Sequence, residues 1–317
     1  MKRRAVLAAT ALLPAGALAQ AWPSRPIRLI VPFAPGGTTD VIARVTAEWL
    51  SPRLGQPVVV ENRPGAGATI GAQLVARAEP DGHTLFMSSS TSHGVSPSVY
   101  QPLGYDPIGD FTHVALLSRT PAALLVGRGY PARDYAGFMD DARRQGELRL
   151  AIAAIGTASH LATVRFGMAA GLRVETVVYR GTGPAITDVI AGIVPGLFDS
   201  LPSAVGHVSA GTLRALALAG EARSALMPEV PTLRELGLDV VSHSWFGLSG
   251  PARLPAAIVA RLSAEIGAMF ADPAMRARFA QLGGVPPATT PESYTRFIRD
   301  EITAYAPLVR AANITPQ

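Results

Sequence analysis

Short apolar runs alternate with segments of helical spacing along almost all of the chain after residue 21. The runs have the length of buried strands, and the segments between them repeat apolar residues every three or four positions, as amphipathic helices do. The apolar runs predict strands at residues 27–32, 58–61, 84–88, 122–126, 148–153, 176–179 and 213–219. The segments with helical spacing of apolar residues predict helices at residues 39–50, 68–78, 135–145, 159–170, 183–191, 255–270 and 291–306.

This alternation is typical of an α/β fold in which helices cover both faces of parallel sheets. The last helix is expected to end before Pro307, because proline lacks the N–H group that continues a helix. A length of 317 residues predicts two domains. No Gly/Pro/Ser-rich linker separates them, so we expect strands that cross between the domains near residues 118–121 and 242–245. The domains are then residues 22–120 plus 245–317, which is discontinuous, and residues 121–244.

The residues before position 22 have the pattern of a secretory signal. A basic K-R-R start precedes a nearly unbroken apolar run over residues 5–19, and small residues then offer cleavage near Ala19 or Ala21. Pro14 interrupts the run, which is shorter than the roughly 20 apolar residues of a membrane-spanning helix. We therefore predict export with a cleaved signal peptide at residues 1–21. A short N-terminal helix is the alternative, and the paired arginines leave the twin-arginine route open.

Composition narrows the classes of site and partner. The chain has no cysteine, which excludes disulfides, thiolate metal sites and a cysteine nucleophile. The formal charge is +5, but positions 2–4 carry three positive charges, so the segment after the signal carries 5 − 3 = +2. Lys2 is the only lysine, and no arginine-rich run alternates with aromatic residues. We therefore expect no nucleic-acid partner.

The segment most informative about chemistry is residues 32–40, P-F-A-P-G-G-T-T-D, which follows a predicted strand and opens a predicted helix. Gly36 and Gly37 allow the backbone to approach a ligand closely. Any of the residues at 38–40 can cap the helix, whose free N–H groups and dipole favour an anion. This pattern predicts a cradle for a carboxylate or a phosphate, and an ordinary strand–helix turn is the alternative.

A second turn with glycine and hydroxyl residues, G-T-A-S-H at residues 156–160, also follows a predicted strand. His160 is there either a ligand contact or a structural residue at a helix end. The histidines lack the spacing of a metal site. The G-A-G-A-T-I-G segment at residues 65–71 lacks the dinucleotide-binding spacing and its acidic partner about 20 residues on. Without a Walker lysine, a G-x-S-x-G elbow or a carboxylate pair, the sequence requires neither an enzyme nor a cofactor.

Further motifs occur in order along the rest of the chain. They are E-N-R-P-G-A-G at residues 61–67, P-D-G-H-T-L at 80–85, Y-D-P at 105–107 with D-F at 110–111, V-Y-R-G at 178–181 with P-A at 184–185 and Asp188, F-D at 198–199, and P-E-V-P-T at 228–232. Together with residues 32–40, they resemble the periplasmic solute receptors of tripartite tricarboxylate transporters, the Bug family. The resemblance covers essentially the whole chain after the signal.

The resemblance implies a type II periplasmic-binding-protein fold, in which two α/β domains surround a cleft and are joined by two crossing strands. It implies a small carboxylated ligand of the di- or tricarboxylate or aromatic acid class, captured by hinge closure without a cofactor. A two-subunit membrane permease would then receive the ligand, and we expect the receptor to be a periplasmic monomer. The alternatives are a receptor that presents its ligand to a signalling protein and, from the α/β pattern, an exported hydrolase.

In this family, the loops that match residues 33–40 and 156–160 face each other across the cleft and hold a carboxylate, partly through water. The ligand contacts so implied are Phe33, Pro35, Gly36, Gly37, Thr38 and Asp40, then Gly156, Thr157, Ser159 and His160, with Ser88, Ser89, Ser90, Thr91 and Asp199 as further lining. Asp199 and residues 88–91 are candidates for recognising the far end of the ligand. Two departures from the family pattern stand out. Ile152 and Ala154 replace a serine and a glycine near the second loop, and Arg180 replaces a lysine on a predicted surface turn.

Overall fold

The computed structural model describes residues 22–284 and 289–314, so the predicted signal peptide lies outside the described residues. The strands are β1 Ile27–Val31, β2 Val58–Asn62, β3 Thr84–Ser89, β4 Phe111–Gly127, β5 Leu148–Ile152, β6 Val174–Val178, β7 Gly196–Ser200, β8 Leu213–Leu218 and β9 His243–Pro251. The helices are α1 Thr38–Leu54, α2 Thr69–Ala76, α3 Ser96–Val99, α4 Tyr135–Gln145, α5 Ala158–Ala170, α6 Thr182–Ile190, α7 Leu201–Ser209, α8 Ala256–Ala271, α9 Pro273–Gln281 and α10 Pro291–Ala311, with short turns η1 Ala66–Ala68 and η2 Ser90–Val95. None of the described helices is long and apolar enough to cross a membrane.

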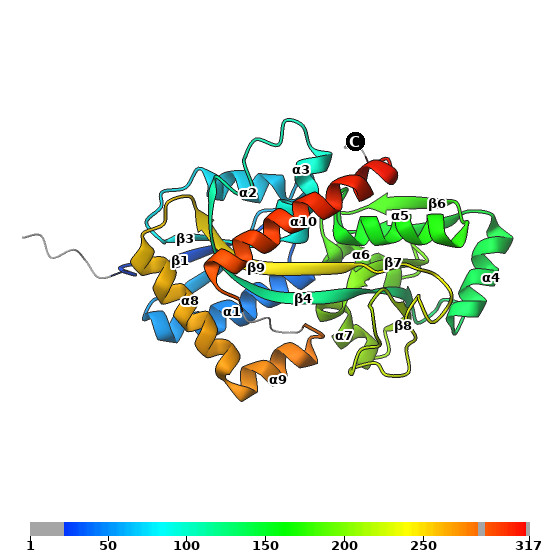
Figure 1. Ribbon diagram of the computed structural model, residues 1–317. Helices are drawn as coiled ribbons and strands as arrows, with labels where there is room; N and C mark the ends of the chain where they lie inside the picture. Colours follow the sequence, from blue (N-terminus) through cyan, green and yellow to red (C-terminus); the bar gives the residue numbers. More distant parts are fainter. Residues whose placement is uncertain (1–21, 285–288, 315–317) are drawn as a thin grey trace, which may run out of the picture.

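The described strands form one mixed sheet in the order β2-β1-β3-β9-β4-β7-β5-β6, with β8 paired to β4. β1 is parallel to β2 and β3 (the first strand group), and β5 is parallel to β6 and β7 (the second strand group), as predicted. The prediction of purely parallel sheets is wrong for β4 and β9, which are antiparallel to each other and to their neighbours. β4 leads the chain out of the first strand group and β9 leads it back, so the two must run in opposite directions (Figure 1).

β4 and β9 connect the two strand groups where the sequence predicted crossing strands. Ser118 of β4 lies opposite Phe246 of β9, and Pro121 lies opposite His243. The two crossing segments are therefore direct partners in the sheet. This antiparallel pair forms the only sheet connection between the groups within the described residues, and it is the natural position for a hinge.

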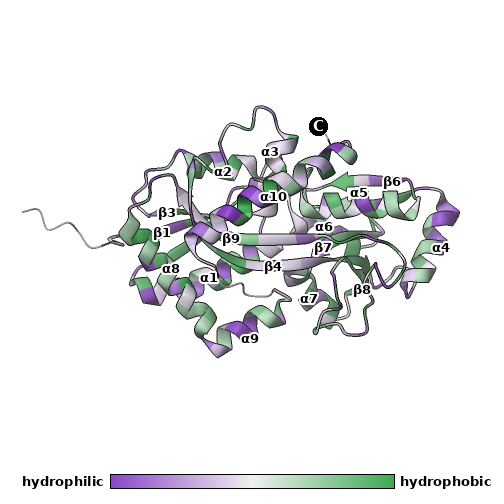
Figure 2. Ribbon diagram, in the orientation of Figure 1, coloured by the Kyte–Doolittle hydropathy of each residue, from purple (hydrophilic) through white to green (hydrophobic). Residues whose placement is uncertain are grey.

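Separate hydrophobic cores lie beside the two strand groups. One core draws on residues 27–117 and again on residues 246–279. Two others lie within residues 122–240. Figure 2 shows hydrophilic residues on peripheral helices such as α4 and α9, whose other faces pack inward. We propose that the division into domains follows these cores, with residues 22–120 plus 245–317 in one and residues 121–244 in the other.

α10 does not end before Pro307, as the sequence predicted, but continues to Ala311. Val309, beyond the proline, is 2% exposed and packs with a small cluster that includes Val95 and Leu161. Burying an aliphatic side chain contributes about 1.5–3 kcal/mol, which is comparable with the roughly 3 kcal/mol that a proline inside a helix costs. The packing of the last turn therefore keeps the helix continuous.

Two buried histidines lie against each other between η2 and β4. His93 and His113 are 0% and 3% exposed, and their ring centroids lie 5.4 Å apart. Neither Nε2 atom has a hydrogen-bond partner among the described residues. Burial lowers the pKa of His113 to about 4. Burial, and then the neighbouring His113, lower the pKa of His93 well below its ordinary value. Both rings are therefore neutral at neutral pH.

We expect the free energy of unfolding to fall as the pH decreases from about 6.5 to 4, because the unfolded chain then binds protons that the folded histidines do not. Each histidine contributes about 1.4 kcal/mol per pH unit in that window. Urea unfolding at several pH values should show a shallower dependence for His113→Gln than for the wild type. Titrating groups outside this histidine pair act alike in both proteins, so equal slopes would contradict the prediction.

Candidate functional site

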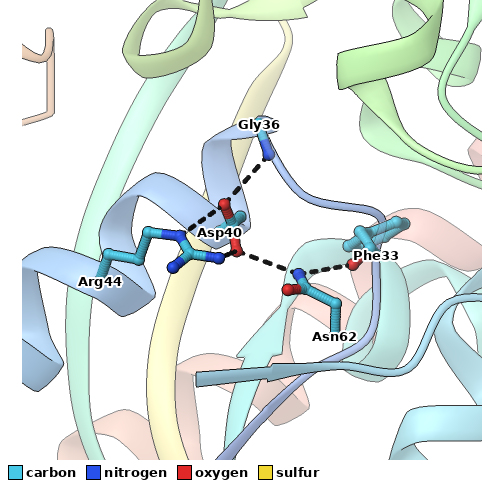
Figure 3. Close-up of polar contacts among 5 residues, drawn as sticks. All are labelled: Phe33, Gly36, Asp40, Arg44 and Asn62. Atoms are coloured by element: carbon cyan, nitrogen blue, oxygen red, sulfur yellow. Dashed lines mark hydrogen bonds and ion pairs between the residues drawn. The ribbon is translucent and has the colours of Figure 1, made fainter. Parts of the chain in front are cut away.

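The loop at residues 33–40 connects β1 to α1 and is held in place by the carboxylate of Asp40. Asp40 Oδ2 accepts a hydrogen bond from the Gly36 N–H at 3.0 Å, and both carboxylate oxygens accept bonds from Arg44 at 2.9 and 3.0 Å. Asn62 donates to Asp40 Oδ1 at 3.0 Å and to the Phe33 carbonyl at 2.9 Å (Figure 3). Burial by itself raises the pKa of Asp40. The hydrogen bonds from Arg44, Gly36 and Asn62 lower this pKa by more than burial raises it, so the net pKa is below its ordinary value and the carboxylate stays ionised. Asp40 thus positions the loop.

This loop presents the free N-terminus of α1. Gly36 has a φ of +85°, which favours glycine, and it turns the chain into the helix. Gly37 is the N-cap residue and makes no side-chain cap, and the first α1 hydrogen bond is from the Val41 N–H to the Gly37 carbonyl. The backbone N–H groups that precede Val41 in the helix therefore have no partner within the helix. Such groups, with the helix dipole, favour an anion.

The loop at residues 156–160 connects β5 to α5 and is also held by its own side chains. Thr157 is the N-cap of α5, where its Oγ1 accepts from the His160 N–H at 3.1 Å and lies 2.9 Å from Ser159 Oγ. The Gly156 N–H donates to His160 Nδ1 at 3.2 Å. Burial lowers the pKa of His160 to about 4, so the ring is neutral and its proton is on Nε2. His160 and Gly156 therefore shape this loop.

The two loops meet at a cavity of about 40 Å³. The predicted site residues that line it are Phe33, Gly37, Thr38, Ser90, Thr91, Thr157, Ser159 and Asp199. The predicted site residues that do not line it are Pro35, Gly36, Asp40, Ser88, Ser89, Gly156 and His160. Most of the second set has another structural partner. Ser88 Oγ, for example, lies 2.8 Å from the Tyr294 hydroxyl, and Ser89 caps η2 through Ser92.

Several lining residues were not predicted as contacts: Thr39, Ala153, Ala158, Thr182, Ser200, Ser244 and Phe246. Thr182 opens α6 directly after Gly181, so a third strand–glycine–hydroxyl turn in the sequence could have revealed it. Ser244 and Phe246 lie on β9, which the sequence indicated only as a crossing segment. Their inward orientation depends on the pairing of β9 with β3 and β4, which local sequence does not specify.

Asp199 is the only ionisable residue among the described residues that line the cavity. Its Oδ1 accepts a hydrogen bond from Thr182 Oγ1 at 3.1 Å, and its Oδ2 is bonded to Ser203 Oγ. Thr38 Oγ1 of the first loop donates to the same Ser203 Oγ at 2.8 Å. Burial raises the pKa of Asp199 to about 6, although the bonds from Ser203, the Ser200 N–H and Thr182 lower it. A buried carboxylate with hydroxyl partners therefore lies beside the anion-favouring loop.

The first loop also contacts residues 180–183 of the second strand group directly. The Ala34 N–H donates to the Arg180 carbonyl at 3.3 Å, which links the first loop to the segment after β6. A Cβ atom added at Gly37 would lie 3.3 Å from Thr182 Cβ, and one added at Gly183 would overlap the Pro35 carbonyl oxygen. Glycine at these positions therefore permits the close approach of the two strand groups.

The arrangement suits the binding of a small anion through hydroxyl and backbone N–H groups. Thr38, Ser90, Thr157 and Ser159 surround the cavity together with the first turn of α1. No group of three or more metal-ligating side chains occurs among the residues that the structure describes. Hydrogen bonds to a charged acceptor contribute about 1.5–3 kcal/mol each.

The chain is similar to known proteins over almost its whole length. The profile of the tripartite tricarboxylate transporter family receptor matches residues 42–314. The protein BugT of Bordetella pertussis is 36% identical over 308 residues, which cover 96% of this chain and 94% of BugT. The structure of the R. palustris protein Rpa4515 with adipate has a TM-score of 0.90 at 32% identity and covers 93% and 100% of the two chains. MatC from Rhodopseudomonas palustris with bound malate has a TM-score of 0.85 at 33% identity, with 91% and 100% covered. The similarity confirms the predicted periplasmic-binding-protein fold.

Proposed function

The chain belongs to the tripartite tricarboxylate transporter receptor family, and on that premise we propose that it captures a small carboxylate between the loops at residues 33–40 and 156–160. The members of this family that it resembles are solute-binding receptors rather than enzymes. The observation that supports the proposal is that the two loops, one from each strand group, line a single cavity with hydroxyl and free N–H groups. Two structural relatives have adipate and malate bound, and both molecules are carboxylates.

The chain would neutralise the charge of the ligand without a cationic side chain. Lys2 is the only lysine, and the described residues that line the cavity include no arginine. The N-terminus of α1 and the hydroxyls of Thr39, Ser90 and Thr91 supply the hydrogen-bond donors instead. Several charge-assisted hydrogen bonds, less the cost of association, are compatible with roughly micromolar affinity.

Capture would proceed by closure about β4 and β9. Each strand group has its own core, and β4 with β9 forms the pair that connects them. The contacts between Ala34 and Arg180 and between Thr38 and Ser203 join the two sides and would form on closure. Closure of this kind is a hinge motion between preformed domains. The closed form would be the state that a membrane permease of two subunits recognises.

The family is periplasmic, and the remaining details of export and assembly are part of the proposal. We propose that the signal peptide is cleaved near Ala19 or Ala21 and that the exported receptor acts as a monomer. Among the described residues, β1 at Ile27 is the first strand, so cleavage at either site leaves the folded elements intact.

Calorimetry of the protein from residue 22 onward should show that carboxylic acids bind and that their amides do not. Matched pairs such as malate with malamide and adipate with adipamide keep the size and shape of the ligand and remove its charge. Binding should also raise the melting temperature in proportion to ligand saturation. If a broad panel of acids gives neither heat nor a thermal shift, the ligand class is wrong.

A further inference from the structure

A small apolar cluster joins the proposed first domain, residues 22–120 and 245–317, to the proposed second domain, residues 121–244. Its buried side chains from the first domain are those of Val95, Val99, Val309 and Ile314, and among the described residues its buried side chain from the second domain is that of Leu161. Partly buried residues that pack against it are Tyr100, Ile155, Tyr305, Leu308 and Ala312. We call this group the bridging cluster. The first domain thus covers an apolar side chain of the second.

Leu161 belongs to α5 but does not pack in the core of its own domain. The next residue, Ala162, and Phe166 one turn later are 0% exposed and belong to the core within residues 122–240. Successive residues lie about 100° apart around a helix, so Leu161 faces another direction. There it is 2% exposed, because the bridging cluster covers it. Separation of the two domains would therefore expose Leu161 to water.

The bridging cluster is connected to both walls of the cavity. Leu161 follows Ser159, which lines the cavity, by two residues of α5. Val95 ends η2, whose first residue, Ser90, lines the cavity from the first domain. Packing of Leu161 against Val95 and its neighbours therefore keeps the two walls of the cavity together.

Further contacts cross between the domains at the cluster. The Tyr100 hydroxyl lies 3.5 Å from the Ile155 carbonyl oxygen. A Cβ atom added at Gly156 would lie 3.2 Å from Val99 Cγ2, so the backbone of the second loop lies against the Val99 side chain. α10 runs from the first strand group toward α5 (Figure 1), and its last turn contributes Val309. The cluster is thus a continuous apolar contact between the domains.

We propose that Leu161 determines the affinity for the ligand without touching it, because its burial in the bridging cluster stabilises the closed form. This inference rests on the proposed function, in which closure about β4 and β9 captures the carboxylate. Leu161 does not line the cavity, so its contribution is apolar and separate from the hydrogen bonds to the ligand. Closure removes the side chain from water, which favours the closed form. The ligand leaves only after the domains separate, so the cluster slows its release.

The test measures the release of radiolabelled adipate and malate by rapid filtration, followed by the other acids of the panel if neither binds. Leu161→Ala should release a bound acid at least about tenfold faster than the wild type, because alanine keeps little of the apolar surface that closure buries. Alanine is a good helix former, so α5 should fold, as circular dichroism would show. The association rate constant, from the calorimetric affinity and the release rate, should not fall. Leu161→Met keeps the apolar volume and should restore slow release.

Met168→Ala is the matched control, because Met168 is also a large apolar residue of α5, is 61% exposed and lies outside the bridging cluster. It should release the acid at the wild-type rate. If acids bind but Leu161→Ala and Met168→Ala release them equally fast, the role of Leu161 is overturned and the proposed function stands. Slower association with unchanged release would also overturn it, because Leu161 would then only shape the second loop. If no acid of the panel binds to the wild type, the proposed function itself fails.

Discussion

The Gly183→Ala variant is expected to fold normally and to bind carboxylates at least about a hundredfold more weakly than the wild type. Gly183 lies at the start of α6 with an ordinary backbone conformation, so alanine suits its own helix. Its added Cβ would overlap the carbonyl oxygen of Pro35, which belongs to the opposite side of the cavity. A backbone atom cannot rotate away as a side chain can. The two sides would therefore stay apart, and the cavity would not form.

Gly37→Val tests the same contact from the other side. Gly37 has φ −86° and ψ 169°, an extended conformation that valine adopts readily. Its Cβ would lie 3.3 Å from Thr182 Cβ, and the two methyl groups of valine add further crowding. We expect this variant to lose binding as well, without a change in fold.

Gly206→Ala in α7 is the control for both variants, since a Cβ atom there meets no other atom within 4 Å. Circular dichroism and thermal melting should show that all three proteins fold, and calorimetry with a bound acid should separate the control from the other two. Small-angle scattering should show compaction on ligand addition in the control alone. Wild-type affinity in both Gly183→Ala and Gly37→Val would exclude closure at this contact.

The sequence predicted the two loops well because their information is local. Each loop is a short glycine-and-hydroxyl segment between a strand and a helix, and that pattern predicts a turn that leads into a helix N-terminus. It did not specify where the side chains point. Asp40 was predicted to contact the ligand, yet its carboxylate binds Arg44 and Asn62. The spacing of four residues between Asp40 and Arg44 is a readable signal of such an ion pair.

The rest of the site depends on contacts between residues far apart in the chain. β4 was predicted only over residues 122–126, although it runs over Phe111–Gly127, because its first part contains polar residues that become buried against β9. Ser244 and Phe246 reach the cavity through that pairing. Thr38 meets Ser203 across 165 positions of sequence. Such contacts follow from tertiary packing, and a single sequence does not specify them.

Carboxylate affinity is expected to fall as the pH rises above about 6, by up to about tenfold per pH unit. The free protein has a buried Asp199 with a pKa of about 6, and its oxygens face hydroxyl groups rather than a cation. A ligand carboxylate placed in the same cavity repels the ionised form and raises that pKa further. Binding therefore takes up a proton. Below pH 6 the proton is already present, and above pH 6 its uptake weakens binding.

Asp199→Asn should remove this dependence, because asparagine keeps the size of the side chain and stays neutral. At about pH 8 the variant should bind a dicarboxylate at least tenfold more tightly than the wild type, and at about pH 5.5 the two should be similar. Calorimetry in buffers of different ionisation enthalpy measures the proton uptake directly, with close to one proton expected for the wild type near pH 7.5 and none for the variant.

The pKa of His160, about 4, lies below this range, so its ring stays neutral throughout. A wild-type affinity that is constant from pH 5.5 to 8 would mean that binding does not change the protonation of Asp199, and this would contradict the prediction.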